Sequence, residues 1–243
     1  MMDWRRLLSA NRMAGDAPDP VDPARSPFQK DFDRIVFCSA FRRLQDKTQA
    51  HPKPGNDYVR TRLTHSLEVA SVGRSLGAGV GQVIAGRRRL PEGLGAAEFG
   101  HIVSAACLAH DIGNPPFGHR GEDLIRGWFA GSRRGQAIIA LLTGGQREDL
   151  LRFEGNAQGF RILTRLQNWR DNGGLRLTAA TLGAFGKYPR LSDSAGDATG
   201  LDAGAKKFGV MQAEASIFRR LADELGLDQV AAGRWRRQPP ASL

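Results

Sequence analysis

The stretch "LAHDIGNPPFGHRGE", residues 108–122, links an apolar run to the start of another predicted helix. The apolar run ends at His110 and Asp111, and Gly113 with the two prolines that follow then stops the helix. Neighbouring side chains do not share a face in the middle of a helix, but at a helix end they can converge on one ion. An imidazole nitrogen and a carboxylate oxygen suit a divalent cation such as Mn, Fe, Zn or Mg. The stretch therefore indicates two ligands of a metal site, and two ligands alone do not make a site.

A third ligand is predicted at His65, in the segment "RTRLTHSLEVA". Arg62 precedes it by three residues and Glu68 follows by three, so all three side chains can project from one side of a helix. Taken alone, His65 and His110 are each also compatible with a buried structural histidine. The metal site is therefore a hypothesis that depends on the three residues lying together.

Periodicity around this stretch predicts an all-α protein. Apolar residues recur at helical spacing in many segments, and no strand-like alternation persists. The expected helices span residues 28–49, 60–83, 96–111, 122–129, 136–142, 156–168, 177–185 and 212–225. Residues 1–27 contain four prolines and predict a loop or arm, and residues 189–207 a long Gly-, Ser- and Asp-rich loop. We expect one helical domain over residues 28–226.

Composition is that of a globular protein. The chain has 243 residues, 41% hydrophobic and 25% charged, enough for one large core. No apolar run is long enough for a membrane span and no leader pattern opens the sequence, so a membrane partner is not expected. Cys38 and Cys107 lie far apart in apolar contexts, as in a reduced, cytoplasmic protein. The net charge of +10 allows nucleic-acid binding, although only six of the 35 basic residues are lysine, a skew that a GC-rich genome also produces.

Four segments in a fixed order resemble one family. "RTRLTHSLEVA", "LAHDIGNPPFGHRGE", "RFEGNAQGFRIL" and "LTAATLGAFGKYP" are similar to motifs of the deoxyguanosine triphosphate triphosphohydrolase (dGTPase) family, within the HD-domain phosphohydrolases. The similarity covers nearly the whole chain, from "FCSAFRRLQDKTQ" to "KFGVMQAEASIFRRLADELGL". The resemblance implies an all-helical HD-domain bundle and a nucleotide substrate.

The resemblance also implies roles for individual residues. His65, His110 and Asp111 would bind a divalent metal ion, Mg, Mn or similar, and His119 with Glu122 would form the catalytic pair. Residues expected to bind substrate are Gln45, Arg62, Asn114, Asn156, Lys187 and Tyr188. Several have structural alternatives. Glu122 could be a carboxylate favoured by the start of a helix, Asn156 a helix cap, and Arg62 a helix-pairing arginine.

The activity implied is metal-dependent hydrolysis of a deoxynucleoside triphosphate, dGTP or a broader set, to the deoxynucleoside and intact triphosphate. Relatives in this family often form homo-oligomers. Two alternatives remain open: another HD-domain nucleotide phosphohydrolase, and a non-catalytic relative that binds nucleotide or single-stranded nucleic acid.

The match to the family pattern ends after "FRRLADELGL". Family members continue there with an "RHPL"-like stretch and a helix bearing an acidic "EAADD"-like motif, whose Asp is a further metal ligand. This sequence has "GRWRRQPPASL", with Gln238 where His is expected. We therefore expect a C-terminally truncated member with a divergent basic tail at 227–243. Its helix at 212–225 would lack packing partners. Residues 1–243 alone would then be weakly active or inactive and would tend to associate through the exposed apolar patch.

Overall fold

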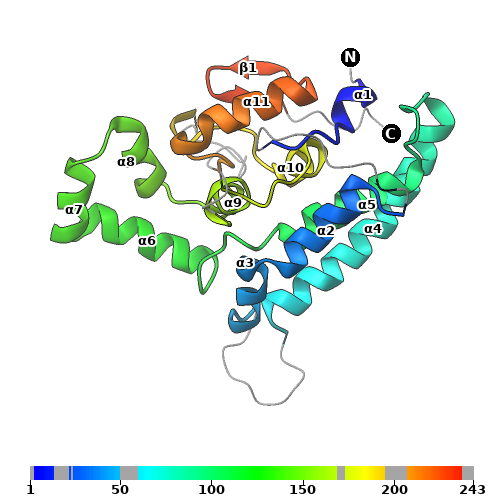
Figure 1. Ribbon diagram of the computed structural model, residues 1–243. Coiled ribbons are helices and arrows are strands. Elements are labelled where there is room, and N and C mark those ends of the chain that lie inside the picture. Colours follow the sequence, from blue (N-terminus) through cyan, green and yellow to red (C-terminus); the bar gives the residue numbers. More distant parts are fainter. Residues whose placement is uncertain are drawn as a thin grey trace.

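The computed structural model describes residues 3–13, 22, 24–49, 60–168, 173–194 and 207–236. Within these residues the fold is all-α, as predicted, apart from one short hairpin (Figure 1). The α-helices are α1 (Trp4–Leu7), α2 (Pro27–Phe37), α3 (Ser39–Arg42), α4 (Arg62–Arg87), α5 (Ala96–Ala109), α6 (His119–Gly131), α7 (Arg133–Ala140), α8 (Gly144–Leu151), α9 (Gly155–Arg161), α10 (Ala179–Phe185) and α11 (Ala215–Leu225). Short 3-10 segments are η1 (Arg43–Asp46), η3 (Ser192–Ser194) and η5 (Gln212–Glu214), and the π-helical turn η2 is Ile162–Leu166.

The single helix expected over residues 28–49 was wrong. Its backbone breaks at Cys38, which is extended with a ψ of 149°. The Cys38 sulfur accepts the N–H of Phe41 at 3.3 Å and so starts the next short helix. Periodicity missed this break because the apolar residues on both sides face the same core.

Helices α4 and α5 pack antiparallel with their backbones in close contact. A Cβ at Gly77 would lie 2.7 Å from the carbonyl oxygen of Phe99, and one at Gly81 would lie 2.4 Å from that of Ala96. Because of the glycines at positions 73, 77 and 81, one side of α4 carries no side chains at these positions, and α5 packs along that side (Figure 1). The antiparallel order brings the start of α4 to the end of α5, where the predicted metal ligands are.

We predict opposite effects of adding a methyl group at two glycines of α4. Gly77→Ala should destabilise the protein by about 1–3 kcal/mol, since the new Cβ meets backbone that cannot rotate away. Gly79→Ala is the matched control, because its Cβ would meet nothing within 4 Å. It should stabilise the helix by roughly 0.5–1 kcal/mol. Urea unfolding measures both, and equal stabilities for the two variants would contradict this packing.

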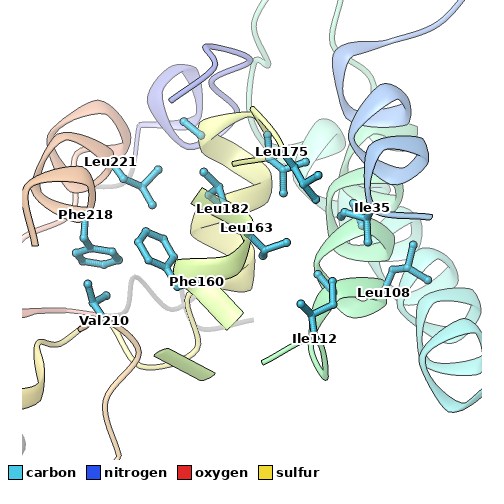
Figure 2. Packing of buried hydrophobic residues seen from close by; sticks show 14 of the residues in the cluster. Ile35, Leu108, Ile112, Phe160, Leu163, Leu175, Leu182, Val210, Phe218 and Leu221 are labelled. Atoms are coloured by element: carbon cyan, nitrogen blue, oxygen red, sulfur yellow. The ribbon is translucent and has the colours of Figure 1, made fainter. Parts of the chain in front are cut away.

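Helices α9, α10 and α11 form one core with α2 and α5 (Figure 2). Phe218 of α11 stacks edge-on against Phe160 of α9 at 5.7 Å and against Trp235 at 5.0 Å between ring centroids. Trp235 is only 6% exposed. It lies on a hairpin of β1 (Gln229–Ala231) and β2 (Arg234–Trp235) that the sequence pattern did not predict.

Two expectations for this region need correction. Phe218, Leu221 and Leu225 of α11 are buried, so the helix does not lack packing partners. The described part of the predicted tail, residues 227–236, is folded against α11. The ring of Trp235 is buried there against Phe218, on the apolar face of that helix. The rest of that tail, residues 237–243, lies outside the described residues.

The described part of the predicted N-terminal arm is also packed. Leu8 lies in a core cluster with Phe28 and Phe99, and the buried Arg12 pairs with Asp31 at 2.8 Å. The expectation of a loop was wrong for Trp4–Leu7, which form α1, while residues 8–13 lie outside any helix. Residues 14–21 and 23 of the same arm lie outside the described residues.

Helices α6, α7 and α8 extend away from the rest of the molecule (Figure 1). Buried Asp149 ties the end of this extension to the core, where it accepts hydrogen bonds from Ser192 Oγ at 2.6 Å and the Gln212 N–H at 2.9 Å. Large apolar side chains are exposed on α6 and α7 and just after α7: Leu124, Trp128, Ile138 and Leu141. Within the described part of the chain, none of the helices has the length and apolar character needed to cross a membrane.

Candidate metal centre

The three predicted metal ligands lie together. The nearest ligand atoms of His65, His110 and Asp111 are all within 4.8 Å of one another. His65 lies in the first turn of α4, which begins at a capping box formed by Thr61 and Thr64. His110 caps the end of α5 and Asp111 follows it. The antiparallel packing of the two helices thus creates the cluster.

A backbone contact sets which ring nitrogen of His110 is available to a ligand. His110 Nδ1 lies 2.7 Å from the carbonyl oxygen of Cys107, a contact in which Nδ1–H donates and Nε2 is left to bind a ligand. Burial, and then the proximity of His110, lower the pKa of His65 below its ordinary value. Two imidazoles and a carboxylate are a donor set that a divalent cation fits.

Asp111 is held from two sides. Its Oδ2 pairs with Nη1 of the buried Arg62 at 2.8 Å, and its Oδ1 accepts a hydrogen bond from Asn114 Nδ2 at 2.6 Å. Arg62 and Asn114 were both expected to bind substrate. In this structure both side chains orient the aspartate, and the guanidinium of Arg62 also balances its charge.

Lys47 is a neighbour that the sequence reasoning missed. Its Nζ donates to the backbone carbonyl of Asn114 at 2.8 Å. Burial lowers the pKa of Lys47, and the nearby Arg62 lowers it further. The lysine lies in "RRLQDKTQ", where nothing in the local pattern separates it from an ordinary surface lysine.

A second group lies at the start of α6. His119 Nε2 is 3.1 Å from Lys207 Nζ, which also donates to Glu154 Oε1 at 3.3 Å. Asn156 Nδ2 donates to the same carboxylate oxygen at 2.6 Å. The group therefore joins predicted residues His119 and Asn156 to two that were not predicted, Glu154 and Lys207.

Glu122 is buried, with only 2% of its surface exposed. Its Oε1 accepts the backbone N–H of Gly155 at 2.8 Å, and its Oε2 lies 4.0 Å from Arg126. The contact expected from the sequence was with His119. The carboxylate instead faces the start of α9 and Arg126.

The remaining predicted substrate residues lie farther out. Gln45 is exposed on η1 and accepts a hydrogen bond from Thr61 Oγ1 at 3.3 Å, next to the start of α4. Lys187 Nζ lies 5.3 Å from the ring centre of Tyr188. The backbone of Tyr188 packs against Gly209, two residues after Lys207. This contact brings the "GKYP" segment near the His119 group.

Comparison with known proteins gives the class. The model of the HD domain family matches residues 62–145, a range that contains His65, His110, Asp111, His119 and Glu122. This segment of the chain is therefore an HD domain.

Within that class the chain is similar to proteins named deoxyguanosinetriphosphate triphosphohydrolase-like. The one from Pseudomonas aeruginosa strain PAO1 is 49% identical over 238 residues, covering 98% of this chain and 52% of the relative. The one from Synechocystis sp. PCC 6803 is 50% identical over 232 residues, or 93% and 52%. The one from Listeria monocytogenes is 39% identical over 230 residues, or 90% and 49%. The chain thus spans about half the length of the curated relatives it matches.

Proposed function

We propose that this chain is the metal-binding part of an enzyme that hydrolyses a deoxynucleoside triphosphate to the deoxynucleoside and intact triphosphate. The observation that supports the proposal is the convergence of His65, His110 and Asp111 within 4.8 Å. The helix that follows them begins at His119, whose Nε2 lies 3.1 Å from Nζ of Lys207. The substrate class is taken from the name of the similar proteins, which specifies deoxyguanosine triphosphate.

His65, His110 and Asp111 would hold the metal ion, either Mg or Mn. When bound, a divalent ion supplies Lewis-acid stabilisation of charge on phosphate oxygens. Arg62 orients Asp111 through their 2.8 Å ion pair. The Cys107 carbonyl fixes which nitrogen of His110 faces the ligand.

His119 is proposed to exchange a proton with the oxygens of the reacting α-phosphate. Lys207, 3.1 Å from His119 Nε2, adds a positive charge where a phosphate oxygen would lie. Glu154 Oε1 accepts hydrogen bonds from Lys207 Nζ at 3.3 Å and from Asn156 Nδ2 at 2.6 Å. Glu154 and Asn156 thereby hold Lys207 in place. Gln45, Lys187 and Tyr188 are proposed as the outer contacts of the nucleoside.

The metal requirement gives a direct assay. After dialysis against a chelator the protein should not hydrolyse dGTP, and addition of Mn²⁺ or Mg²⁺ should restore activity. Deoxynucleoside monophosphates and ribonucleoside triphosphates serve as the comparison substrates. Preferential hydrolysis of a monophosphate would favour the alternative, another HD-domain nucleotide phosphohydrolase.

A second candidate is the binding of single-stranded nucleic acid without catalysis. The observation for it is an open cleft of 640 Å³ whose lining includes Arg25, Lys30, Arg34 and Arg176. Phe37, 71% exposed, also lines this cleft, and an exposed aromatic ring among basic groups suits a stacked base.

Self-association through the exposed apolar residues of α6 and α7 is a further proposal, which sedimentation tests.

A further inference from the structure

Two short segments of the candidate site lie side by side with their backbones in contact. The first is residues 187–192 and the second is residues 207–212. The N–H of Gly209 donates to the carbonyl oxygen of Arg190 at 3.3 Å, and a parallel bridge joins the next residue of each segment. A Cβ at Gly209 would collide with the carbonyl oxygen of Tyr188. The two segments therefore run in the same direction and have a fixed register.

The residues proposed to contact the substrate lie at the same end of both segments. Lys187 and Tyr188 begin the first segment, and Lys207 begins the second. Lys207 Nζ lies 3.1 Å from His119 Nε2. Because the two backbones are paired, a change in their register would move Lys207 relative to Lys187 and Tyr188.

Asp149 joins the two segments at their opposite end. Ser192 ends the first segment, and its Oγ donates to Asp149 Oδ1 at 2.6 Å. Gln212 ends the second, and its N–H lies 2.9 Å from Oδ1 and 3.0 Å from Oδ2 of the same side chain. Asp149 is only 4% exposed, so water cannot easily replace it as the acceptor, and an unpaired buried N–H would be costly.

Helix α8, which carries Asp149, also fixes the second segment in two further places. Gly145 lies one turn before Asp149, and a Cβ there would lie 2.8 Å from Gln212 Cγ. The chain that leaves α8 leads to Glu154, whose Oε1 accepts the Lys207 Nζ at 3.3 Å. The second segment is therefore held at both ends by α8 and the residues that follow it.

We propose that Asp149 is a positioning residue, which holds residues 187–192 and 207–212 in register and thereby keeps Lys207 together with Lys187 and Tyr188. The effect on substrate binding rests on the proposed function. Asp149 itself lies at the far end of both segments and takes no part in the reaction. The requirement is for a buried acceptor that Ser192 and Gln212 can share.

Three substitutions test this requirement. Asp149→Ala removes the shared acceptor. Asp149→Asn keeps an oxygen for the Gln212 N–H, and its amide can donate to the Ser192 hydroxyl, which is able to accept. Glu148→Gln is the matched control for loss of a carboxylate on α8, because Glu148 is partly exposed and pairs with Arg152 at 2.7 Å.

The first measurement does not depend on substrate: amide hydrogen exchange in the full chain, followed by NMR. The Gln212 amide reports the bond to Asp149, and the Gly209 amide reports the register close to Lys207. In Asp149→Ala both should exchange at least about tenfold faster, while in Asp149→Asn and Glu148→Gln they should stay within about threefold of the original protein. The Ala70 amide inside α4 should be unchanged, which separates local loosening from global unfolding.

If Asp149→Ala does not fold, Ser192→Ala takes its place. This variant releases only the first segment, so exchange should rise at Gly209 and stay unchanged at Gln212. Unchanged exchange at both amides would then overturn the proposal.

The second measurement is the Kd for inorganic triphosphate, measured by calorimetry with Mn²⁺ held constant. Asp149→Ala should bind triphosphate at least about tenfold more weakly, since a displaced Lys207 loses a charge-assisted contact with phosphate. Asp149→Asn and Glu148→Gln should bind it as the original protein does. Gly77→Ala is the control for lost stability, because it disturbs the packing of α4 and should leave the Kd unchanged.

Faster exchange at Gln212 with unchanged exchange at Gly209 in Asp149→Ala would confine Asp149 to a local turn and overturn the proposal. So would a Kd for triphosphate that is the same in Asp149→Ala and the original protein, or one that weakens equally in Gly77→Ala. If the original protein neither binds triphosphate nor hydrolyses dGTP, the proposed function fails, and exchange at Gly209 still decides whether Asp149 sets the register.

Discussion

Substitution of His119 by Ala should lower kcat for dGTP hydrolysis by about 10²–10⁴-fold, the usual contribution of a general acid–base group. His119 is the first residue of α6, the helix that follows the metal-ligand loop. Its Nε2 lies 3.1 Å from Nζ of Lys207, which comes from a distant part of the chain. Affinity for Mn²⁺, measured by calorimetry, should stay the same, because His119 lies outside the ligand cluster.

His101→Ala is the matched control for this prediction. His101 lies on α5 and contacts Glu98 at 3.2 Å, within the same helix and two turns before His110. Its removal should leave kcat unchanged. A fall in metal affinity that parallels the loss of activity in His119→Ala would place His119 among the metal ligands and contradict its assignment to proton transfer.

Substitution of His110 by Ala should abolish the binding of Mn²⁺. The change removes one of three ligands, and the remaining His65 and Asp111 cannot hold the ion with comparable affinity. The helical circular dichroism should be nearly unchanged, since His110 is a partly exposed C-cap residue and its ring contacts the Cys107 carbonyl at the helix end.

Equilibrium dialysis against Mn²⁺ measures the stoichiometry in the original protein and in His110→Ala. We expect one ion and none, respectively, with His101→Ala again retaining one. Equal stoichiometry in the original protein and in His110→Ala would show that the cluster is not the metal site.

The sequence was sufficient to predict the HD domain and the convergence of His65, His110 and Asp111. An apolar helix that ends in His110 and Asp111, next to a loop with two prolines, places both side chains at a helix end whatever the rest of the fold does. The prediction of His65 also depended on the start of one helix meeting the end of another. Glycines at 73, 77 and 81 supply that geometry, and their four-residue spacing was visible in the sequence.

The contacts between segments that lie far apart in the sequence could not be predicted, because no single motif encodes them. Lys207 reaches His119 across 88 residues of chain, and the Glu122 hydrogen bond to Gly155 crosses 33. Trp235 was assigned to a tail because a lone tryptophan in a basic segment carries no periodicity. Its burial depends on the face that Phe218 presents after folding.

The central claim is that the site releases intact triphosphate from a deoxynucleoside triphosphate, and the identity of the first product tests it most directly. The protein, loaded with Mn²⁺ and given dGTP in ¹⁸O-labelled water, should produce deoxyguanosine and triphosphate in equal amounts, with the label in the triphosphate, since water attacks the α-phosphorus. Ion-exchange chromatography and mass spectrometry detect both products. Diphosphate or orthophosphate as the first product, or ¹⁸O in the deoxyguanosine, would contradict the proposed reaction.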